Sequence, residues 1–480
     1  MIRACLLATA ALTVSVPLSA APAPATTVGA TLPASNPFAQ PSTLPLQTPD
    51  FSRIKSSDYL PALLAGMAQE KTEATAIANQ AAAPTFNNTV VAMERSGLLL
   101  ERTNMAFQAV NGADTDDVLQ ATDTKTAPLF AQHRDFIYLN AKLFQRFKYL
   151  HDHLAELNLN PEQARLLDVY YKQFVHSGAE LPAAKQAQLK VLNTRLSTLQ
   201  TAFNQKLLSA AKTSALHVTD ASALAGLSDE QIAAAKQAAA DRKVAGYVLP
   251  MQNTTQQPAL SALTSHATRQ KLLNASLNRA EHGDANDTRA TIAELAQLRA
   301  QKAALMGYPT WADYTLYDQM AKNRQTAVAF LDRLAPGTAA KERQEASDIR
   351  ALAKAQGANF EPTAADWNFY SEQIRKQRYA LSDEELKPYF EFNKVLTDGV
   401  FYAANQLYGI TFKERKDIPT WSPDMRVFEV FDQDGTQLAL FMIDPWKRDN
   451  KNGGAWMDNL VKQSTLRGTK PVVYNVENFT

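Results

Sequence analysis

The residue types that could do chemistry gather near the end of the chain, in the stretch DPWKRDNKNGGAWMDN. It combines Asp444, Arg448 and Lys451 with the pair Gly453–Gly454 and with Trp456. Paired glycines let another backbone approach closely, and a tryptophan beside them can form a wall. The stretch therefore predicts a strand edge to which an extended peptide adds its backbone hydrogen bonds. The alternative is a hairpin connection with a buried tryptophan.

Motifs for other kinds of chemistry are missing from the sequence. None of the seven histidines begins an H-E-x-x-H, and the only close pair is His151 and His153. Two residues apart on a helix, their rings point in different directions, so we expect a solvated helix end and no shared metal. A Ser/His/Asp triad stays open, although the sequence has no G-x-S-x-G. It also has neither of the glycine-rich phosphate-binding loops.

Charge and cysteine content narrow the function classes. The 480 residues include 49 basic and 48 acidic side chains, so nothing favours nucleic acid or an anionic membrane as a partner. Cys5 is the only cysteine and lies within an N-terminal leader. We therefore expect a mature chain without a thiol, which excludes disulfides and a thiol-protease mechanism.

The first 21 residues read as a signal peptide. Arg3 supplies a short positive region, Ala4–Val16 is apolar, and Ser19-Ala20-Ala21 suits cleavage. The apolar run is too short to span a bilayer, so we expect a periplasmic protein without a membrane anchor after cleavage. The alternative is an uncleaved N-terminal anchor.

Helical spacing dominates the elements that must position the site. Residues 22–50 are rich in Pro, Ala, Ser and Thr and predict an extended arm. From residue 51 onward, apolar residues recur every three or four positions. Helix starts are predicted by three pairs of cap and capping-box residues, and Gly307 predicts a helix end. These pairs are Asn160 with Gln163, Ser228 with Gln231, and Ser382 with Glu385.

Strand patterns appear late in the chain. The stretch RVFEVFDQDGTQLALFMID predicts a hairpin that turns at Asp434-Gly435. A polar, Gly-rich connection follows, and Val472–Tyr474 predicts a buried strand. An earlier pair of short strands is predicted in LHVTD and AGYVLPM. We therefore divide the chain into a helical lobe at 51–425 and a strand region at 426–480.

A series of short motifs along the whole mature chain resembles one family of zinc metallopeptidases. This is the family of thimet oligopeptidase, oligopeptidase A and, most similar, bacterial peptidyl-dipeptidase. Two departures are Asn87, where the family usually has an acid, and Ala365, where it usually has a second Trp. The motifs include NPF (36–38), PTFNNT (84–89), APLFAQHRDFIYLNAKLFQRF (127–147), FVHSGAEL (174–181), DWNFYSEQIRKQRYALSDEELKPYF (366–390), FMIDPWKRDNKNGGAWMD (441–458) and PVVYNVENFT (471–480).

The resemblance implies a mainly α fold: the two-lobed, neurolysin-like peptidase architecture with a small β-sheet near the C-terminal end. The lobes flank a channel that admits short unfolded peptides. In the family, an H-E-x-x-H helix after the last motif supplies two zinc ligands and a general base, the next helix supplies a third ligand, and downstream tyrosines stabilise the oxyanion. None of these residues occurs in the 480, so the catalytic part is expected to be missing.

We therefore expect the chain to be the N-terminal portion of a zinc peptidase that removes C-terminal dipeptides. It would carry no catalytic residue and no metal ligand, and would be inactive alone. What carries over from the resemblance is Gly453, Gly454 and Ala455, as candidate backbone contacts for a peptide. The alternative is a non-catalytic, secreted helical protein that holds peptides, or a remnant of such a peptidase.

Overall fold

The computed structural model describes residues 32–251, 253–380 and 383–479. Most of them are helical, and a small sheet lies near the C-terminal end, which confirms the predicted mainly α fold class. The leader at 1–21 and the predicted cap Ser382 lie outside the described residues. No helix in the described part of the chain is long and apolar enough to cross a membrane.

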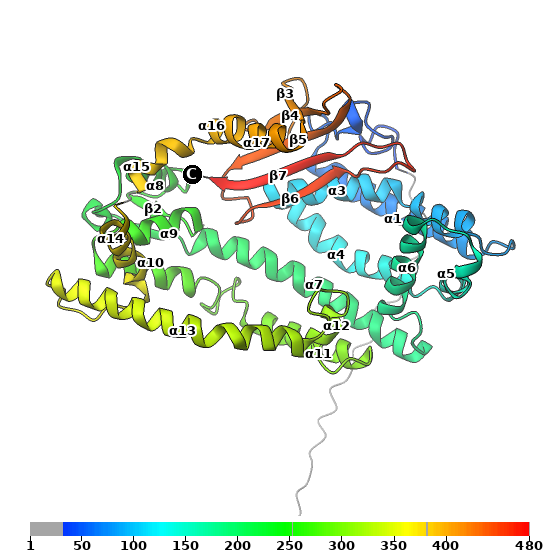
Figure 1. Ribbon diagram of the computed structural model, residues 1–480, viewed down its shortest axis with the longest axis horizontal. Coiled ribbons are helices and arrows are strands. Elements are labelled where there is room, and N and C mark those ends of the chain that lie inside the picture. Colours follow the sequence, from blue (N-terminus) through cyan, green and yellow to red (C-terminus); the bar gives the residue numbers. More distant parts are fainter. Residues whose placement is uncertain (1–31, 252, 381–382, 480) are drawn as a thin grey trace, which may run out of the picture. The chain divides into compact units, whose positions relative to one another are not determined.

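Helices run from Ser56 to Tyr408 (Figure 1). The α-helices are α1 (Ser56–Ala78), α2 (Ala92–Glu94), α3 (Leu98–Ala113), α4 (Asp117–Tyr138), α5 (Ala141–Asp152), α6 (Pro161–His176), α7 (Ala183–Thr213), α8 (Asp229–Asp241), α9 (Asn253–Ala262), α10 (His266–Leu277), α11 (Arg289–Leu305), α12 (Trp311–Leu316), α13 (Arg324–Ala355), α14 (Trp367–Tyr379), α15 (Asp383–Leu386), α16 (Phe392–Lys394) and α17 (Tyr402–Tyr408). The 3-10 segments are η1 (Pro45–Gln47), η3 (Leu154–Glu156), η4 (Ala221–Leu224), η5 (Ala364–Asp366) and η6 (Lys387–Phe390), and the π segments are η2 (Phe86–Val91) and η7 (Val395–Phe401).

Two of the predicted helix starts and the predicted helix end are confirmed. Asn160 accepts a hydrogen bond from the Gln163 N–H at 2.8 Å, and the Gln163 side chain accepts one from the Asn160 N–H at 3.1 Å. Ser228 and Gln231 form the same box at the start of α8. After α11 the chain turns at Gly307, whose φ of +83° suits glycine. Local sequence therefore sets these helix boundaries.

The described part of the predicted arm packs against the helices. Phe38 is 4% exposed, and its ring centroid lies 5.2 Å from that of Tyr59 on α1. The Asn36 side chain donates to the Asp58 carbonyl at 3.0 Å. Residues 32–50 thus cover the core, although η1 is their one regular segment.

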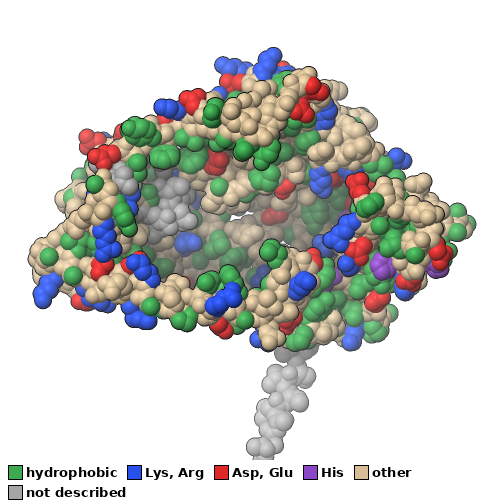
Figure 2. Space-filling view, viewed as in Figure 1, with side chains coloured by type: hydrophobic (Ala, Val, Ile, Leu, Met, Phe, Trp, Pro, Cys, Tyr) green, Lys and Arg blue, Asp and Glu red, His purple; other side chains and the backbone are tan. Residues whose placement is uncertain are grey.

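A row of packed helices leads away from the sheet. Helix α3 contacts β6 and α1, α1 contacts α4, α4 contacts α7, and α7 contacts α11. Figure 1 shows α7 and α13 running below the strands. The same face is hollowed between the upper and lower elements in the space-filling view (Figure 2).

The late sheet has five strands in the order β3-β4-β5-β7-β6. Its predicted hairpin is confirmed: β4 and β5 pair antiparallel, and Gly435 in the turn has a φ of +82°. The earlier strand pair is also confirmed. The strands are β1 (Leu216–Val218), β2 (Tyr247–Leu249), β3 (Thr411–Glu414), β4 (Arg426–Phe431), β5 (Gln437–Trp446), β6 (Trp456–Val461) and β7 (Val472–Phe479).

Strand β7 is longer than the predicted strand at Val472–Tyr474 and continues to Phe479. It runs parallel to β5 on one side and antiparallel to β6 on the other. Val472, Tyr474 and Val476 are buried, so the alternating burial continues beyond the predicted strand. The predicted end of this strand at Tyr474 is therefore too early.

The two faces of the sheet are covered differently. Leu440 and Met442 of β5 pack on one face with Ala109 and Ala113 of α3. On the other face, Ile443 packs with Leu396 of η7, next to a cluster of phenylalanines. Because successive strand residues point to opposite faces, both faces of β5 are buried. The sheet is therefore held firmly where β5 ends and the Gly-rich connection begins.

Candidate functional site

Strand β6 lies at the edge of the sheet. It pairs with β7, and in the described part of the chain no strand pairs with its other side. Met457 and Asp458 of β6 are exposed, and Met457 is 60% exposed. An edge strand presents backbone N–H and C=O groups that an extended chain can bind. The structure thus provides the open strand edge that the sequence predicts.

The connection between β5 and β6 spans residues 447–455. Because β5 and β7 are parallel, the connection starts at the end of the sheet where β7 also ends, and it passes that end to reach β6. Pro445 lies at an irregularity in the β5–β7 pairing, which suits a residue without an N–H. The path of this loop therefore follows from the order of the strands.

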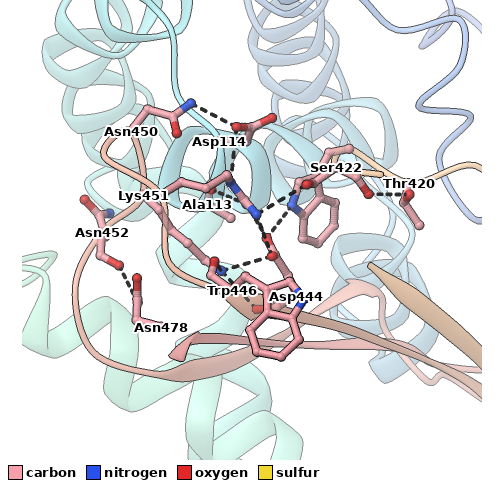
Figure 3. Close-up of polar contacts among 12 residues, drawn as sticks. Ala113, Asp114, Thr420, Ser422, Asp444, Trp446, Asn450, Lys451, Asn452 and Asn478 are labelled. Atoms are coloured by element: carbon pink, nitrogen blue, oxygen red, sulfur yellow. Dashed lines mark hydrogen bonds and ion pairs between the residues drawn. The ribbon is translucent and has the colours of Figure 1, made fainter. Parts of the chain in front are cut away.

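A buried carboxylate fixes the start of the loop (Figure 3). Asp444 has no exposed surface, and its Oδ2 accepts from the Trp421 indole at 2.9 Å and from Arg448 at 2.6 Å. Its Oδ1 accepts from Arg448 at 2.9 Å and from Lys451 at 3.0 Å. The Lys451 ammonium also donates to the carbonyls of Asp444 and Trp446. One carboxylate thus organises both ends of a short loop segment.

This network decides the protonation of Asp444. Burial alone would raise the pKa of Asp444, but hydrogen bonds from Arg448, Trp421 and Lys451 outweigh it and hold the pKa below its usual range. The carboxylate is therefore ionised at neutral pH. Removing it would leave Lys451 without a counter-charge and Arg448 with only its longer ion pair to Asp114, at 3.5 Å, and such losses destabilise a fold strongly.

The loop is also tied to the end of α3. Arg448 donates to the Ala113 carbonyl at 2.7 Å, which satisfies one of the last carbonyls of the helix. The Thr115 N–H donates to the Asn450 carbonyl at 3.1 Å, and the Asn452 N–H donates to the Gly112 carbonyl at 2.9 Å. These bonds hold the loop against α3 along several residues.

A further tie reaches α8, because Arg242 forms an ion pair with Asp449 of the loop at 2.7 Å. The loop is thereby connected to three elements that are far apart in sequence: the sheet, α3 and α8. Such cross-links restrict its conformations before any ligand binds, which reduces the ordering entropy that binding costs.

The predicted contact residues lie at the exposed tip of this loop. Gly453, Gly454 and Ala455 are all exposed, and Ala455 directly precedes β6. No heavy atom lies within 4 Å of the position that a Cβ would take at either glycine. From below, the Asn478 side chain donates to the carbonyls of Asn452 and Gly454, at 2.9 and 2.7 Å. The tip is thus open outward and fixed inward.

The structure corrects the predicted role of the charged residues in this stretch. Asp444 and Lys451 are buried beneath the loop and position it, whereas sequence reasoning placed them with the open edge. Trp456 contributes to the apolar cluster against α3, and its ring would lie 3.4 Å from a Cβ at Gly112. The alternative of a buried tryptophan thus holds in part, since Trp456 is half-buried, and its role as a wall for a peptide stays a prediction.

Comparison with known proteins relates part of the chain to one family. Residues 259–480, slightly less than half of the chain, match the model of peptidase family M3. This part of the chain is an M3 peptidase domain. It is 45% identical to "Dipeptidyl carboxypeptidase" of Escherichia coli (strain K12) over 445 residues, and 30% identical to "Oligopeptidase A" of the same strain over 446 residues. Each alignment covers 92% of this chain and 65% of the relative.

A third relative gives the same relation. "Dipeptidyl carboxypeptidase" of Salmonella typhimurium (strain LT2) is 45% identical over 446 residues, which cover 93% of this chain and 66% of that protein. The chain therefore spans slightly less than two thirds of the length of these relatives. The M3 match includes the whole strand region, and with it the loop 447–455.

A metal centre does not fit the described residues of this M3 domain. Among residues 32–251, 253–380 and 383–479, no group of three His, Cys, Asp or Glu side chains could hold a metal ion. His151 stacks on Tyr171 with ring centroids 3.8 Å apart, and His153 stacks on Tyr149 at 4.3 Å. The two histidines thus contact different partners, and we route no chemical step through a metal in this chain.

Sequence reasoning missed two residues that hold the loop 447–455 in place. Trp421 comes before the first hairpin strand, so nothing in its neighbourhood indicated a contact with Asp444. Asn478 lies at a buried position of β7, where a strand rarely has asparagine. That mismatch between residue type and position was the available signal, but it required β7 to be extended beyond Tyr474.

Proposed function

We propose that this chain binds short extended peptides along β6 and the adjoining loop tip, as part of a metallopeptidase that removes C-terminal dipeptides. The observation that carries the proposal is the open strand edge at Trp456–Val461, which directly follows a tightly anchored loop. Membership of peptidase family M3 supports a peptidase function for the protein. The release of dipeptides is inferred from similarity to two relatives named "Dipeptidyl carboxypeptidase". This chain spans less than two thirds of the length of each.

Binding would proceed by strand addition. The peptide backbone would pair with the N–H and C=O groups of β6 that point away from β7, and alternate side chains would define specificity. The fixed carbonyls of Asn452 and Gly454 keep the tip in one conformation. The open space over Gly453 and Gly454 leaves room for a second backbone. Short unfolded peptides satisfy this geometry, because their backbone groups are free.

Zinc is implied by the family resemblance. Because the described residues supply no ligand group and the 480 residues contain no H-E-x-x-H, we propose that the ligands and the general base come from other polypeptide. The expected result is that purified residues 1–480 show no cleavage of a blocked oligopeptide above a metal-free control when zinc is added. Turnover that depends on zinc would contradict this part of the proposal.

The test of peptide binding uses Gly453→Val. The backbone of Gly453 has no positive φ and no atom near the Cβ position, so valine fits the fold but fills the open side. We expect at least about a tenfold loss of affinity for a dye-labelled octapeptide, measured by fluorescence anisotropy, equivalent to about 1.4 kcal/mol.

The matched control is Gly337→Val on α13, which is also open and has no positive φ. It should bind the peptide like the unchanged chain. Equal affinity for both variants would show that the loop tip does not contact the peptide. An assay of the native protein, purified from its source cells, distinguishes a peptidase from a protein that only holds peptides. Release of dipeptides supports the peptidase, and binding without cleavage supports the peptide-holding protein.

The leader supports a periplasmic location as a further proposal. Cell fractionation and N-terminal sequencing of the mature protein test it. A mature chain that begins after Ala21 and appears in the periplasmic fraction is expected. A protein that keeps Met1 and sediments with membranes would point to the uncleaved anchor.

A further inference from the structure

A second region of the molecule has binding features and does not involve the loop tip. A half-open cavity of about 1030 Å³ is lined mainly by helices α3, α4, α6, α7, α11 and α12 together with residues 462–467. This volume lies at the upper end of the range of small-molecule sites. Neither Gly453, Gly454 nor Ala455 lines it.

Three cations in the cavity have no carboxylate partner. Arg299 donates to the Gln200 side chain at 3.0 Å, and Lys302, one turn later on α11, donates to the Asn193 side chain at 2.7 Å. Arg134 of α4 lies over the ring of Tyr138, 5.5 Å from its centroid. Among the described residues, none of the three forms an ion pair with an acidic side chain. Asp135 acts on Arg134 and Lys302 through space without a direct ion pair, so three cations share one carboxylate and this wall keeps an excess of positive charge.

The neighbouring cations of the same cavity show the contrast. Lys462 and Arg467 both pair with Glu101, the first at 2.9 Å. Each of these two cations has a carboxylate partner, although they share it. The cavity thus has one wall whose cations are paired with a carboxylate and one whose cations are not, and the second wall attracts an anion.

Two buried polar atoms in the cavity also lack partners. Asp135 is 5% exposed, and only its Oδ1 is bonded, accepting from Asn193 at 2.7 Å. His133 is 6% exposed, its Nε2 contacts Glu70 at 2.8 Å, and its Nδ1 has no partner. Both residues line the cavity. Since buried polar atoms are rarely left unpaired, these atoms point to a missing polar ligand.

Asn193 connects the two kinds of group. Its amide N–H donates to Asp135 and its amide oxygen accepts from Lys302. The Asp135 carboxylate and the Lys302 ammonium therefore lie on either side of the Asn193 side chain. A ligand with an N–H donor a few bonds from an anionic group would match this arrangement, as an N-acylated amino acid does.

Aromatic side chains supply the rest of the wall. Trp311, Tyr314, Tyr138 and Phe130 line the cavity, and Arg299 lies over the Trp311 ring at 5.7 Å. Aromatic walls favour an apolar or aromatic ligand body. An inorganic anion would satisfy the cations but leave most of the volume unused.

We propose that this cavity binds a small carboxylate with an aromatic body and an adjacent amide, such as an N-acylated aromatic amino acid. Its carboxylate lies among Arg134, Arg299 and Lys302, and its amide N–H donates to Asp135. The proposal does not depend on peptide binding at β6, because the two regions share no contact residue.

The test is isothermal titration calorimetry of the chain at pH 7 with N-acetyl-L-phenylalanine, its amide N-acetyl-L-phenylalaninamide, and inorganic phosphate. We expect the acid to bind at least about tenfold more tightly than the amide, and more tightly than phosphate. Absence of binding, or equal affinity for acid and amide, overturns the proposal. Equal affinity for acid and phosphate overturns the aromatic part of the site.

Variants assign the binding to this cavity. Arg134→Gln removes an exposed cation that forms no hydrogen bond with the described residues, so the chain should fold normally and bind the acid at least about fivefold more weakly. Lys302→Gln should lose about tenfold. The control is Lys354→Gln, an exposed lysine near the end of α13, which should bind unchanged. Unchanged affinity in both cavity variants, with intact circular dichroism, would overturn the assignment.

Discussion

The loop 447–455 and the cavity beside α11 differ in how their charged side chains are paired. Beneath the loop, Asp444 binds two cations and accepts from Trp421, although the Nε of Arg448 and the Oδ1 of Asn478 have no hydrogen-bond partner among the residues that the structure describes. In the cavity, three cations have no acidic partner, and Asp135 keeps a free oxygen. A charge that is satisfied within the fold positions backbone, whereas one left unsatisfied is available to a ligand. The same chain thus contains a rigid support and a receptive pocket.

The largest loss of stability is expected for a substitution of Asp444. Asp444→Ala leaves Arg448 and Lys451 without their carboxylate, so we expect a loss of about 3–5 kcal/mol in the free energy of unfolding, measured by urea denaturation. Asp332→Ala, at an exposed position of α13, should change it by less than about 0.5 kcal/mol. Similar values for the two variants would show that the network does not stabilise the fold.

The second test makes the same substitution at two lysines. Lys451 has a carboxylate partner, whereas Lys302, in the described part of the chain, hydrogen-bonds only to an amide oxygen. Lys451→Met removes three hydrogen bonds, to Asp444 and Trp446, and should destabilise the chain by about 2 kcal/mol. Lys302→Met removes a cation that burial disfavours, and should stabilise the chain by about 1 kcal/mol at pH 7. Destabilisation by both would mean that Lys302 is as well satisfied as Lys451.

The pH dependence of stability sharpens this second test. Burial, with a smaller effect of Arg134, lowers the pKa of Lys302 to about 8. Because the folded state binds this proton more weakly than the unfolded state, stability should rise with pH from about 8 until the ordinary lysine pKa is passed. Measured from pH 7 to 10.5, the difference in stability between the unchanged chain and Lys302→Met should shift steadily in favour of the unchanged chain. A difference that does not change with pH would show that burial does not lower the pKa of Lys302.

The smallest expected effect concerns the loop tip. Asn478→Ala removes the two hydrogen bonds to the carbonyls of Asn452 and Gly454, which should cost about 1 kcal/mol in stability. It should also speed amide hydrogen exchange in residues 452–455, measured by mass spectrometry. Unchanged exchange would show that other contacts suffice to fix the tip.

Sequence alone predicted the elements whose signals are local. The capping boxes at Asn160 and Ser228, the hairpin turn at Gly435 and the exposed glycine pair all depend on residues a few positions apart. The contact of Trp421 with Asp444 joins residues 23 positions apart, and that of Arg448 with Ala113 joins residues 335 apart. Such contacts follow from strand order and helix packing, which periodicity does not specify.

The cavity was outside the reach of sequence reasoning for the same reason. Arg134, Asn193 and Lys302 come from three helices, and each looks like an ordinary residue of a solvated helix face. Only the packing of α4, α7 and α11 side by side turns them into one wall. Whether each charge has a partner is a property of the assembled fold.

The strand order has a consequence for how this region folds. Strands β4 and β5 form one hairpin, and β6 and β7 form another, and each contains mainly local contacts that can form within microseconds. The parallel seam between β5 and β7 joins them and closes only when the second hairpin docks. The bonds of loop 447–455 to Asn478 and to α3 form in that same step. Loop ordering and seam closure should therefore appear as one kinetic event, later than either hairpin.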